Sequence, residues 1–218
     1  MILAAGRGQR MGALTDSVPK PLLELHGETL LGRQLRRLAE SGIREVVINL
    51  SYRGDQIRKS IGDGSDYGLV VSYSQEPETP LETAGGIIQA LPLLGSEPFV
   101  VVNADVVSDF DPGQLQPGPV DGLLVLVPNP EHNPEGDYGL DADGLLVPDE
   151  PRYTFSGISL LSPALFAGLE PGRRALSDVF DSAIAARRLS GLVYYGDWHD
   201  VGTPERLQQA AAADSGTR

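Results

Sequence analysis

The chain has 218 residues, of which 41% are hydrophobic, and a formal net charge of −13. This length and apolar content predict one domain over residues 1–213 with a flexible tail over 214–218. The excess of carboxylates excludes a general affinity for nucleic acid or anionic membranes, and the absence of cysteine excludes disulfides, thiolate metal sites and a cysteine nucleophile.

No apolar run approaches the roughly 20 residues of a membrane span, and Met1 begins a strand-like segment without a basic leader. We therefore expect a cytoplasmic protein, a monomer or small homo-oligomer, that contacts neither membrane nor nucleic acid. Any polyanionic ligand must be held by backbone N–H groups, a few placed cations or a bound metal ion.

Short apolar segments alternate with amphipathic ones along the first two-thirds of the chain. Strands are predicted over 1–5, 45–50, 69–73, 98–104 and 122–127, and helices over 29–41, 55–61 and 84–91. Gly42 suits the C-terminal cap of the first helix. This alternation predicts an α/β fold with a parallel or mostly parallel sheet, helices on both faces and ligands at the carboxyl ends of the strands.

Residues 109–151 are rich in proline, glycine and acidic side chains, which predicts loops and a hairpin inserted on one side of the sheet. The alternation then resumes. A strand is predicted over 153–161, a helix over 176–189, a strand over 192–196 and a closing helix over 203–213. Thr203 is its expected N-cap, with Pro204 in the first turn.

The opening MILAAGRGQRMG places three glycines directly after the first strand. A Walker-type loop is excluded because no Lys-Ser or Lys-Thr pair follows. A dinucleotide fingerprint is disfavoured because Gly12 is one place late and ALTDSVPKP stands where a helix should begin. The favoured interpretation is a glycine loop that folds over nucleotide phosphates with Arg10 as its cation. A tight turn between surface arginines is the alternative.

Lysine is rare in this chain: of 17 basic residues, only positions 20 and 59 are lysine. Lys20 stands between Pro19 and Pro21, whose rings fix φ on both sides and stiffen the base of the side chain. A compact ammonium aimed at phosphate suits this position. A chance lysine in a proline-rich turn is the alternative.

Two aspartates follow strand-like runs, Asp105 in VVVNADV and Asp200 in WHDVGTPE. Each alone would usually be a cap or a turn residue. Mg²⁺ takes one or two carboxylates and leaves its other positions to water and phosphate, so together with the glycine loop and Lys20 the two aspartates are candidate metal ligands.

This set of motifs resembles the sugar 1-phosphate nucleotidyltransferase family. Its signature L-A-A-G-x-G-x-R-M is matched from Leu3 to Met11. The other matching segments follow in the same order: PKPLLEL, LGRQLRRLAESGIREVVINL, EPETPLETAGG, NADV, TFSGI and WHDVGTPERL. The nearest likeness is to a short bacterial branch that transfers a uridylyl group to N-acetylmuramic acid α-1-phosphate in peptidoglycan recycling.

The resemblance implies a three-layer Rossmann-like fold with a mixed, mostly parallel central sheet. It implies a nucleoside triphosphate and a sugar 1-phosphate as substrates, Mg²⁺ as cofactor, and in-line attack on the α-phosphorus. Positioning and charge neutralisation would carry the catalysis, so no activated Ser, Cys or His is needed.

The resemblance also implies site residues. Catalysis is expected from Arg10, Lys20 and Asp105, and metal binding from Asp105 and Asp200. Nucleotide binding is expected from Ala5, Gly6, Gly8, Gln9, Arg10, Lys20, Glu82 and Gly85, with Gly85 and Gly86 allowing close approach of base and ribose. Sugar binding is expected from Asn103, Asp137, Glu150, Ser156 and Gly157. For Asp137, Ser156 and Gly157, purely structural roles are an equal alternative.

One departure concerns the incoming phosphate. Many relatives carry a lysine in an E-K-P element, whereas this chain reads VPDEPRYTF, and Arg152 is the hypothetical substitute. Three alternatives to the uridylyltransferase stay open. They are a mannose or heptose 1-phosphate guanylyltransferase, a non-catalytic nucleotide-sugar sensor subunit and a dinucleotide-binding oxidoreductase.

Overall fold

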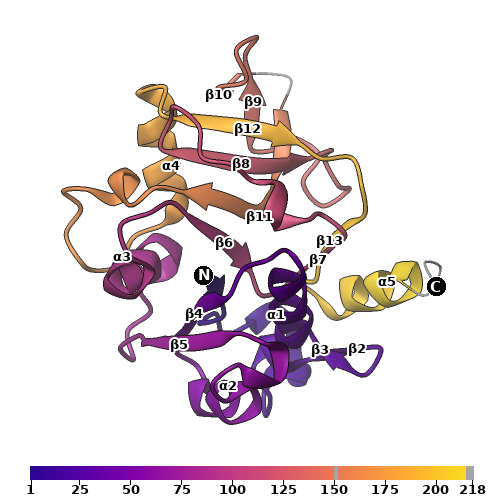
Figure 1. Ribbon diagram of the computed structural model, residues 1–218. Helices are drawn as coiled ribbons and strands as arrows, with labels where there is room; N and C mark the ends of the chain where they lie inside the picture. The colour runs from indigo at the N-terminus through magenta and orange to yellow at the C-terminus, as the bar shows by residue number, and fades with distance from the viewer. Residues whose placement is uncertain (150–151, 215–218) are drawn as a thin grey trace.

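The computed structural model describes residues 1–149 and 152–214, which fold around a nine-stranded sheet (Figure 1). Its first part is parallel, in the order β6-β1-β4-β5. These strands are β1 (Ile2–Leu3), β4 (Glu45–Leu50), β5 (Val70–Gln75) and β6 (Phe99–Asn103). Apolar, β-branched segments such as EVVINL suit these positions because both faces of the strands are covered.

The remaining strands are arranged around β11 (Arg152–Leu161), which is antiparallel to β6, β8 and β9. Beyond it, β12 is parallel to β8, and β10 is antiparallel to β9. The bounds are β8 (Gly122–Val127), β9 (Tyr138–Leu140), β10 (Leu146–Val147) and β12 (Leu189–Val193). Within the described sheet, only β10 and β11 therefore run against the other strands, which confirms the predicted mixed, mostly parallel sheet.

The helices that cover the two faces of the sheet are α1 (Leu30–Glu40), α2 (Gly54–Ile61), α3 (Glu82–Leu94) and α4 (Leu176–Ala185). A further helix, α5 (Pro204–Asp214), lies beside the sheet (Figure 1) and packs in a small separate cluster with Leu25 and Leu30. α1 begins where the Thr29 hydroxyl accepts the N–H of Gly32 (3.0 Å), and Gly42 follows its end in the left-handed region (φ 85°). None of the helices in the described ranges is both long and apolar enough to cross a lipid bilayer.

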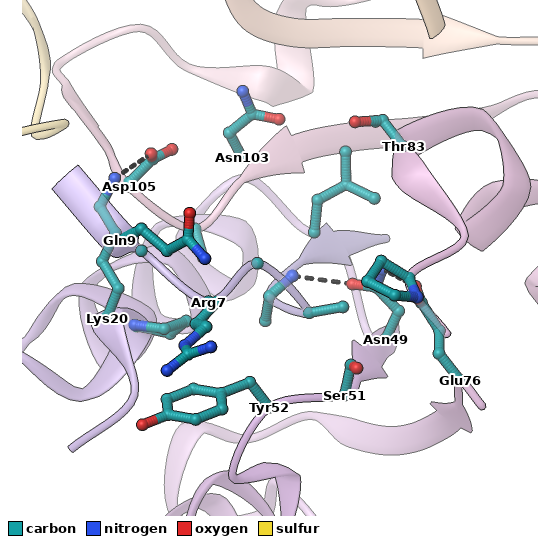
Figure 2. A pocket seen from close by; sticks show the side chains of 18 of the residues that line it. Arg7, Gln9, Lys20, Asn49, Ser51, Tyr52, Glu76, Thr83, Asn103 and Asp105 are labelled. Carbon is teal, nitrogen blue, oxygen red and sulfur yellow. Dashed lines mark hydrogen bonds and ion pairs between the residues drawn. The ribbon is translucent and has the colours of Figure 1, made fainter. Parts of the chain in front are cut away.

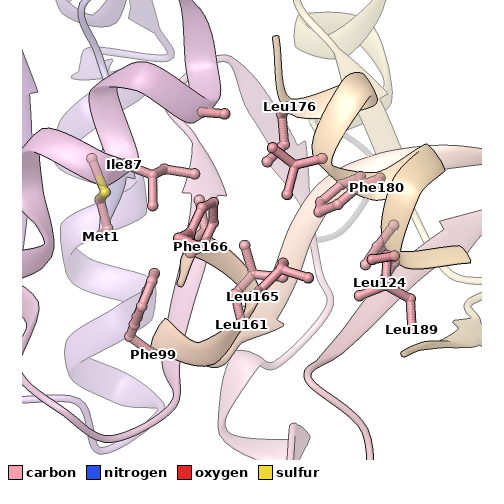
Figure 3. Close-up of a cluster of buried hydrophobic side chains, with 14 of the residues drawn as sticks. Met1, Ile87, Phe99, Leu124, Leu161, Leu165, Phe166, Leu176, Phe180 and Leu189 are labelled. Atoms are coloured by element: carbon pink, nitrogen blue, oxygen red, sulfur yellow. The ribbon is translucent and has the colours of Figure 1, made fainter. Parts of the chain in front are cut away.

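Two hydrophobic cores lie on the opposite faces of the sheet. Ile87 of α3 and Phe180 of α4 belong to one core (Figure 3), and Leu35 of α1 and Ile57 of α2 belong to the other. Successive residues of β8 alternate between the two cores, as the period of a strand requires. This arrangement produces the three layers that the family resemblance implied.

The fourth helix and the strand after it differ from the prediction. α4 ends at Ala185 rather than at residue 189, because Arg187 adopts a left-handed conformation (φ 56°) that a helix does not continue. β12 then begins at Leu189, which is fully buried and lies opposite Gly122 of β8. The strand predicted over 192–196 therefore starts three residues earlier.

The stretch 109–151 contains the β9-β10 hairpin and also β8, which pairs with two neighbours in the sheet. Two further antiparallel pairings of described strands lie outside the main sheet. They are β2 (Glu24–Leu25) with β3 (Glu28–Thr29), and β7 (Val106–Ser108) with β13 (Trp198–Asp200). The second pairing joins the end of the β6 segment to the segment that leads into α5.

Candidate active site

A cavity of about 840 Å³ opens at the carboxyl ends of β1, β4 and β6 (Figure 2). Nine of the residues expected at the site line it: Ala5, Gly6, Gly8, Gln9, Arg10, Lys20, Glu82, Asn103 and Asp105. They come from four separate segments of the chain, which the parallel strands bring to one edge of the sheet.

The glycine loop forms one wall of this cavity. After β1 the chain turns through Gly8 (φ 67°) into a 3₁₀ turn, η1 (Gln9–Thr15), and the carbonyl of Gly8 accepts the N–H of Met11 (2.9 Å). A Cβ at Gly8 would lie 2.9 Å from Cβ of Lys20. Gly8 is therefore required twice, for its backbone conformation and for the close approach of the lysine.

Lys20 lies deep in the cavity wall, and its residue is only 8% exposed. The flanking prolines set it at the start of the short turn η2 (Lys20–Leu22). Its Nζ forms an ion pair with Oδ2 of Asp105, drawn as a dashed line in Figure 2. The structure thus joins the ammonium group and one candidate metal ligand directly.

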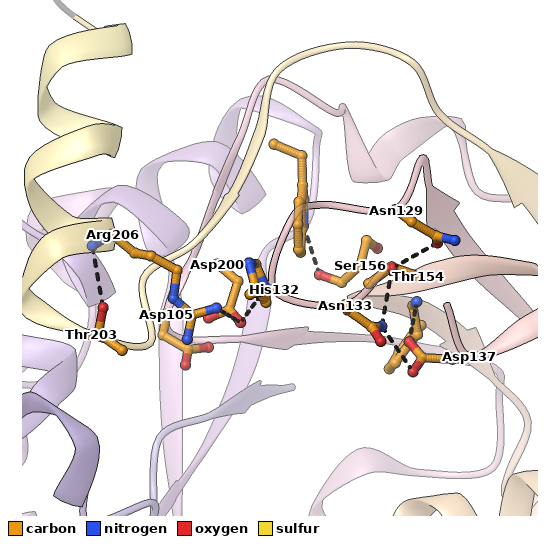
Figure 4. A network of polar contacts seen from close by, with 12 residues as sticks. Asp105, Asn129, His132, Asn133, Asp137, Thr154, Ser156, Asp200, Thr203 and Arg206 are labelled. Carbon is orange, nitrogen blue, oxygen red and sulfur yellow. Dashed lines mark hydrogen bonds and ion pairs between the residues drawn. The ribbon is translucent and has the colours of Figure 1, made fainter. Parts of the chain in front are cut away.

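The pairing of β7 with β13 brings the two candidate metal ligands to neighbouring positions. Asp200 lies opposite Val106, and the N–H of Val201 donates to the carbonyl of Asp105 (2.9 Å). Oδ2 of Asp200 accepts a hydrogen bond from Arg206 of α5 (2.9 Å) and lies 3.7 Å from Nε2 of His132 (Figure 4). Asp200 is not itself among the cavity-lining residues, although Gly202 is.

The donor set suits a hard divalent cation that is shared with phosphate. Among the side chains that the structure describes, no three or more His, Cys, Asp or Glu residues gather in a group that could hold a metal ion. One or two carboxylates, with phosphate and water as the other ligands, is the arrangement that Mg²⁺ prefers.

A buried polar network behind the glycine loop was not foreseen from the sequence. Asn49 accepts the N–H of Ala4 (2.7 Å) through Oδ1 and donates to Oε1 of Glu76 (2.7 Å) through Nδ2. Burial raises the pKa of Glu76 above its usual value, although the hydrogen bond from Asn49 opposes the shift. The network ties the ends of β1, β4 and β5 together beneath the cavity.

The start of α3 forms the opposite wall. Glu82 lines the cavity in a left-handed conformation (φ 57°) and pairs with Arg173 (Nη2 to Oε1, 2.5 Å). Gly85 does not line the cavity. A Cβ there would lie 2.3 Å from the carbonyl oxygen of Gly172, so the close approach that the structure shows at Gly85 is to protein backbone. Likewise, a Cβ at Gly86 would lie 2.5 Å from Glu76.

Among the residues expected to contact the sugar, Asn103 lines the cavity and Gly157 supports it. Gly157 has φ 79°, and a Cβ there would lie 2.6 Å from Nδ2 of Asn103. Ser156 is buried below the surface of the site. Its hydroxyl accepts the N–H of Ile158 (3.1 Å), and its carbonyl accepts the indole N–H of Trp198 (2.9 Å).

Asp137 is engaged in holding a loop. Its carboxylate accepts the N–H of Phe155 (2.7 Å) and the side-chain amide of Asn133 (3.1 Å) (Figure 4). Asp137, Ser156 and Gly157 thus make structural contacts and do not line the cavity. The guanidinium of Arg152 donates to the carbonyl of Pro148 (2.9 Å) and is also absent from the lining. Glu150 lies outside the described residues.

Several cavity residues carried no expectation, among them Arg7, Ser51, Tyr52 and Glu78. Arg7 occupies a variable position of the signature, and Tyr52 follows β4 without a recognisable motif. The one available signal for Tyr52 was its position two residues after a predicted parallel strand. Residues at such positions lie at the edge of the sheet where ligands bind.

The known proteins that this chain resembles include nucleotidyltransferases that act on sugar phosphates. Residues 1–139 match the nucleotidyl transferase family. The chain is 47% identical over 222 residues to the N-acetylmuramate alpha-1-phosphate uridylyltransferase of Neisseria meningitidis, covering 97% of this chain and 96% of that protein. It is 31% identical over 220 residues to a mannose-1-phosphate guanylyltransferase catalytic subunit beta of Drosophila pseudoobscura pseudoobscura, covering 94% of this chain and 59% of that one.

Among solved structures, the inositol-1-phosphate CTP transferase of T. maritima superposes with a TM-score of 0.80 at 18% identity, over 97% of this chain and 93% of that one. A likeness at this identity shows the fold alone. With a family match over more than half of the chain and a relative of nearly equal length, the chain belongs to the nucleotidyl transferase family and is an enzyme of the sugar 1-phosphate nucleotidyltransferase kind.

Proposed function

We propose that the enzyme joins N-acetylmuramic acid α-1-phosphate to UTP, giving UDP-N-acetylmuramic acid and pyrophosphate, with Mg²⁺ as its cofactor and peptidoglycan recycling as its context. The observation that carries the proposal is the 47% identity to a uridylyltransferase of this specificity over almost the full length of both chains. The cavity supports the reaction because it combines a glycine loop, a buried lysine and an aspartate at one strand edge.

In the proposed reaction, an oxygen of the sugar phosphate attacks the α-phosphorus of UTP in line with the leaving group. A new P–O bond forms as the bond from the α-phosphorus to the bridging oxygen breaks, and pyrophosphate leaves with that electron pair. Because the sugar phosphate is already a competent nucleophile, the enzyme only has to position the two anions and neutralise their charge.

The residues of the cavity have distinct roles in this proposal. Backbone N–H groups around Gly6 and Gly8 bind the triphosphate, and the exposed guanidinium of Arg10 counters its charge. Lys20 leaves its ion pair with Asp105 to bind the reacting phosphates. Asn103 faces the incoming sugar, and Glu82 with Thr83 lies on the wall proposed for the base.

Asp105 and Asp200 are the residues proposed to hold the metal ion. Asp105 directly precedes β7 and Asp200 ends the paired strand β13, and each carboxylate is balanced in the structure by a cation, Lys20 or Arg206. When bound, Mg²⁺ would neutralise charge on the phosphate oxygens.

Pyrophosphate release from purified enzyme tests the proposal. UTP, dTTP and GTP are each combined with N-acetylmuramic acid, N-acetylglucosamine, mannose and heptose 1-phosphates, with Mg²⁺ or with excess chelator. We expect turnover with UTP and N-acetylmuramic acid 1-phosphate only when metal is present. D105N should lower kcat at least a hundredfold, whereas D143N, which changes an exposed aspartate outside the cavity, should retain full activity.

The same assay separates the alternatives. Strict use of GTP with mannose or heptose 1-phosphate would replace the uridylyl assignment by a guanylyltransferase, to which the chain is also related. Binding of nucleotide sugar without turnover of any substrate pair would indicate a sensor subunit. Retention of Arg10, Lys20, Asp105 and Asp200 argues for the enzyme.

A further inference from the structure

The glycine loop presents two guanidinium groups to the cavity, those of Arg7 and Arg10. Neither forms an ion pair within residues 1–149 and 152–214, although the chain carries 30 acidic residues against 17 basic ones. In so acidic a protein, two exposed arginines without carboxylate partners at one cavity indicate that an anionic ligand supplies the partner.

Arg7 is held in place by an aromatic platform. Its Cζ lies 5.4 Å from the centroid of the Tyr52 ring, in the range of a cation–π contact, and Figure 2 shows the guanidinium beside that ring. Tyr52 is half-buried and lies in the short turn between the end of β4 at Leu50 and the start of α2 at Gly54, so elements on both sides anchor the platform.

Tyr52 is in turn fixed to the far end of the glycine loop. Its hydroxyl donates to the carbonyl of Thr15 (3.1 Å), and Arg53, also in contact with the ring (5.3 Å), donates to the carbonyl of Asp16 (2.5 Å). The tyrosine therefore contacts both ends of the loop. A guanidinium positioned in this way loses little conformational freedom when a ligand binds.

The place of Arg7 within the cavity identifies the part of the ligand that it meets. Lys20 and Asp105 mark the reacting phosphates, Asn103 the sugar side, and Glu82 with Thr83 the side proposed for the base. Figure 2 shows Arg7 and Tyr52 on the wall away from Asn103 and Thr83. Because the other walls are assigned, the wall formed by Arg7 and Tyr52 is where the two phosphates that leave as pyrophosphate would lie.

We infer that Arg7, positioned by Tyr52, binds the β- and γ-phosphates of the nucleotide and the pyrophosphate that they become. The inference rests on the proposed function and adds a specificity-determining residue to it. Arg7 contacts the substrate, whereas Tyr52 is a positioning residue that acts through Arg7. Arg7 accordingly favours triphosphates over diphosphates and leaves the nucleotide-sugar product unaffected, because that product has lost both phosphates.

Steady-state kinetics in both directions test this inference with R7Q, Y52L and Y52F. R7Q and Y52L should raise KM for UTP and for pyrophosphate about tenfold, the usual effect of losing one charge-assisted contact. KM for the sugar 1-phosphate and for the UDP-sugar should stay within twofold of the wild type. Y52F keeps the ring that contacts Arg7 and loses only the hydroxyl bond to Thr15, so its KM values should lie between those of the wild type and Y52L.

R58Q is the matched control. Arg58 of α2 makes the same kind of contact with the ring of Tyr73 of β5 (4.4 Å to the ring centroid), and neither residue lines the cavity. The R58Q substitution removes the same charge as R7Q and should leave every KM unchanged. Circular dichroism and urea unfolding verify that each variant is folded.

An unchanged KM for pyrophosphate in R7Q, or an equal rise in KM for the UDP-sugar, would overturn the inference while leaving the uridylyltransferase assignment intact. Absence of turnover in the wild type would instead refute the proposed function. Calorimetric titration of the same variants with pyrophosphate then decides the inference independently, because weaker binding by R7Q supports it and equal binding refutes it.

Discussion

At the scale of single residues, Glu76 is the carboxylate whose surroundings differ most from water within the cavity wall. It is 6% exposed, and its partner Asn49 also holds the N–H of Ala4 at the start of the glycine loop. Burial raises its pKa above the ordinary value of 4.5, so the folded protein binds this proton more tightly than the unfolded chain does.

This shift predicts a pH-dependent contribution to stability. The contribution of Glu76 is fully present below about pH 4.5 and is lost as the pH rises through the raised pKa. The free energy of unfolding of the wild type minus that of E76Q should therefore decrease from pH 4 to pH 8, because glutamine does not titrate. Urea unfolding of both proteins at each pH and at matched ionic strength measures this difference. A difference independent of pH, or one that grows with pH, would contradict the assignment.

Which site residues could be predicted depended on whether their chemistry is visible in a local motif. Gly8, Arg10 and Lys20 stand in short segments with distinctive spacing, and the structure places all three at the cavity. Asn49 and Glu76 are 27 positions apart and meet only because β4 and β5 pair in parallel. Glycine was the least informative type: Gly85 makes a close approach, but to the backbone of Gly172.

At the scale of elements, the start of α3 depends on a distant loop for its capping. The N–H groups of Ala84 and Gly85 both lie within hydrogen-bond distance of the carbonyl of Arg174 (3.1 and 3.2 Å), and the N–H of Arg174 donates to the carbonyl of Leu81 (2.9 Å). The loop before α4 thus replaces the side-chain cap that this helix lacks.

The substitution Gly85→Ala should push the start of α3 away from the loop that precedes α4. The added Cβ would lie 2.3 Å from the carbonyl oxygen of Gly172, and relieving the overlap should cost about 1–3 kcal/mol of unfolding free energy. Gly118→Ala is the control. It adds the same methyl group in open space and should be neutral or stabilise by up to about 1 kcal/mol. Equal effects of the two substitutions in urea unfolding would show that the Gly172 contact is unimportant.

The elements that sequence patterns located well were long or strongly apolar. β4 and β8 begin and end where their EVVINL and GLLVLV segments do, and α1 differs from its predicted range by one residue at each end. β7 and β13 are three residues long, too short for any periodicity to appear. Neither was predicted, because both lie just beyond strands predicted over 98–104 and 192–196, although their pairing brings the segments of the two aspartates together.

At the scale of the whole molecule, an acidic protein that binds a triphosphate must concentrate its few cations at one place. The chain carries a net charge of −13, while Arg7, Arg10 and Lys20 line a single cavity. These three cations offset, at the cavity, the repulsion between the acidic protein and its anionic substrate. A bound divalent metal ion would add to the same effect.

This arrangement predicts a stabilisation that requires metal and nucleotide together. At 100 times the dissociation constant, UTP with Mg²⁺ should add about 2.7 kcal/mol to the free energy of unfolding, which for a chain of this size raises Tm by about 5–10 °C. UTP with chelator should give a much smaller shift. D105N should lose the metal-dependent part and D143N should keep it. Protection by NAD in place of UTP would instead favour a dinucleotide-binding oxidoreductase.

The pairing of β13 with β7 has a consequence for synthesis on the ribosome. The cavity walls up to Asp105 belong to the first half of the chain, but Asp200 and Arg206 emerge only near its end. At about 5–20 residues per second, a nascent chain carries the glycine loop and Lys20 for roughly 9–36 seconds before the second aspartate is added. A product that terminates before residue 200 lacks one of the two residues proposed to hold the metal ion, so we expect nucleotidyl transfer to begin only after translation is nearly complete.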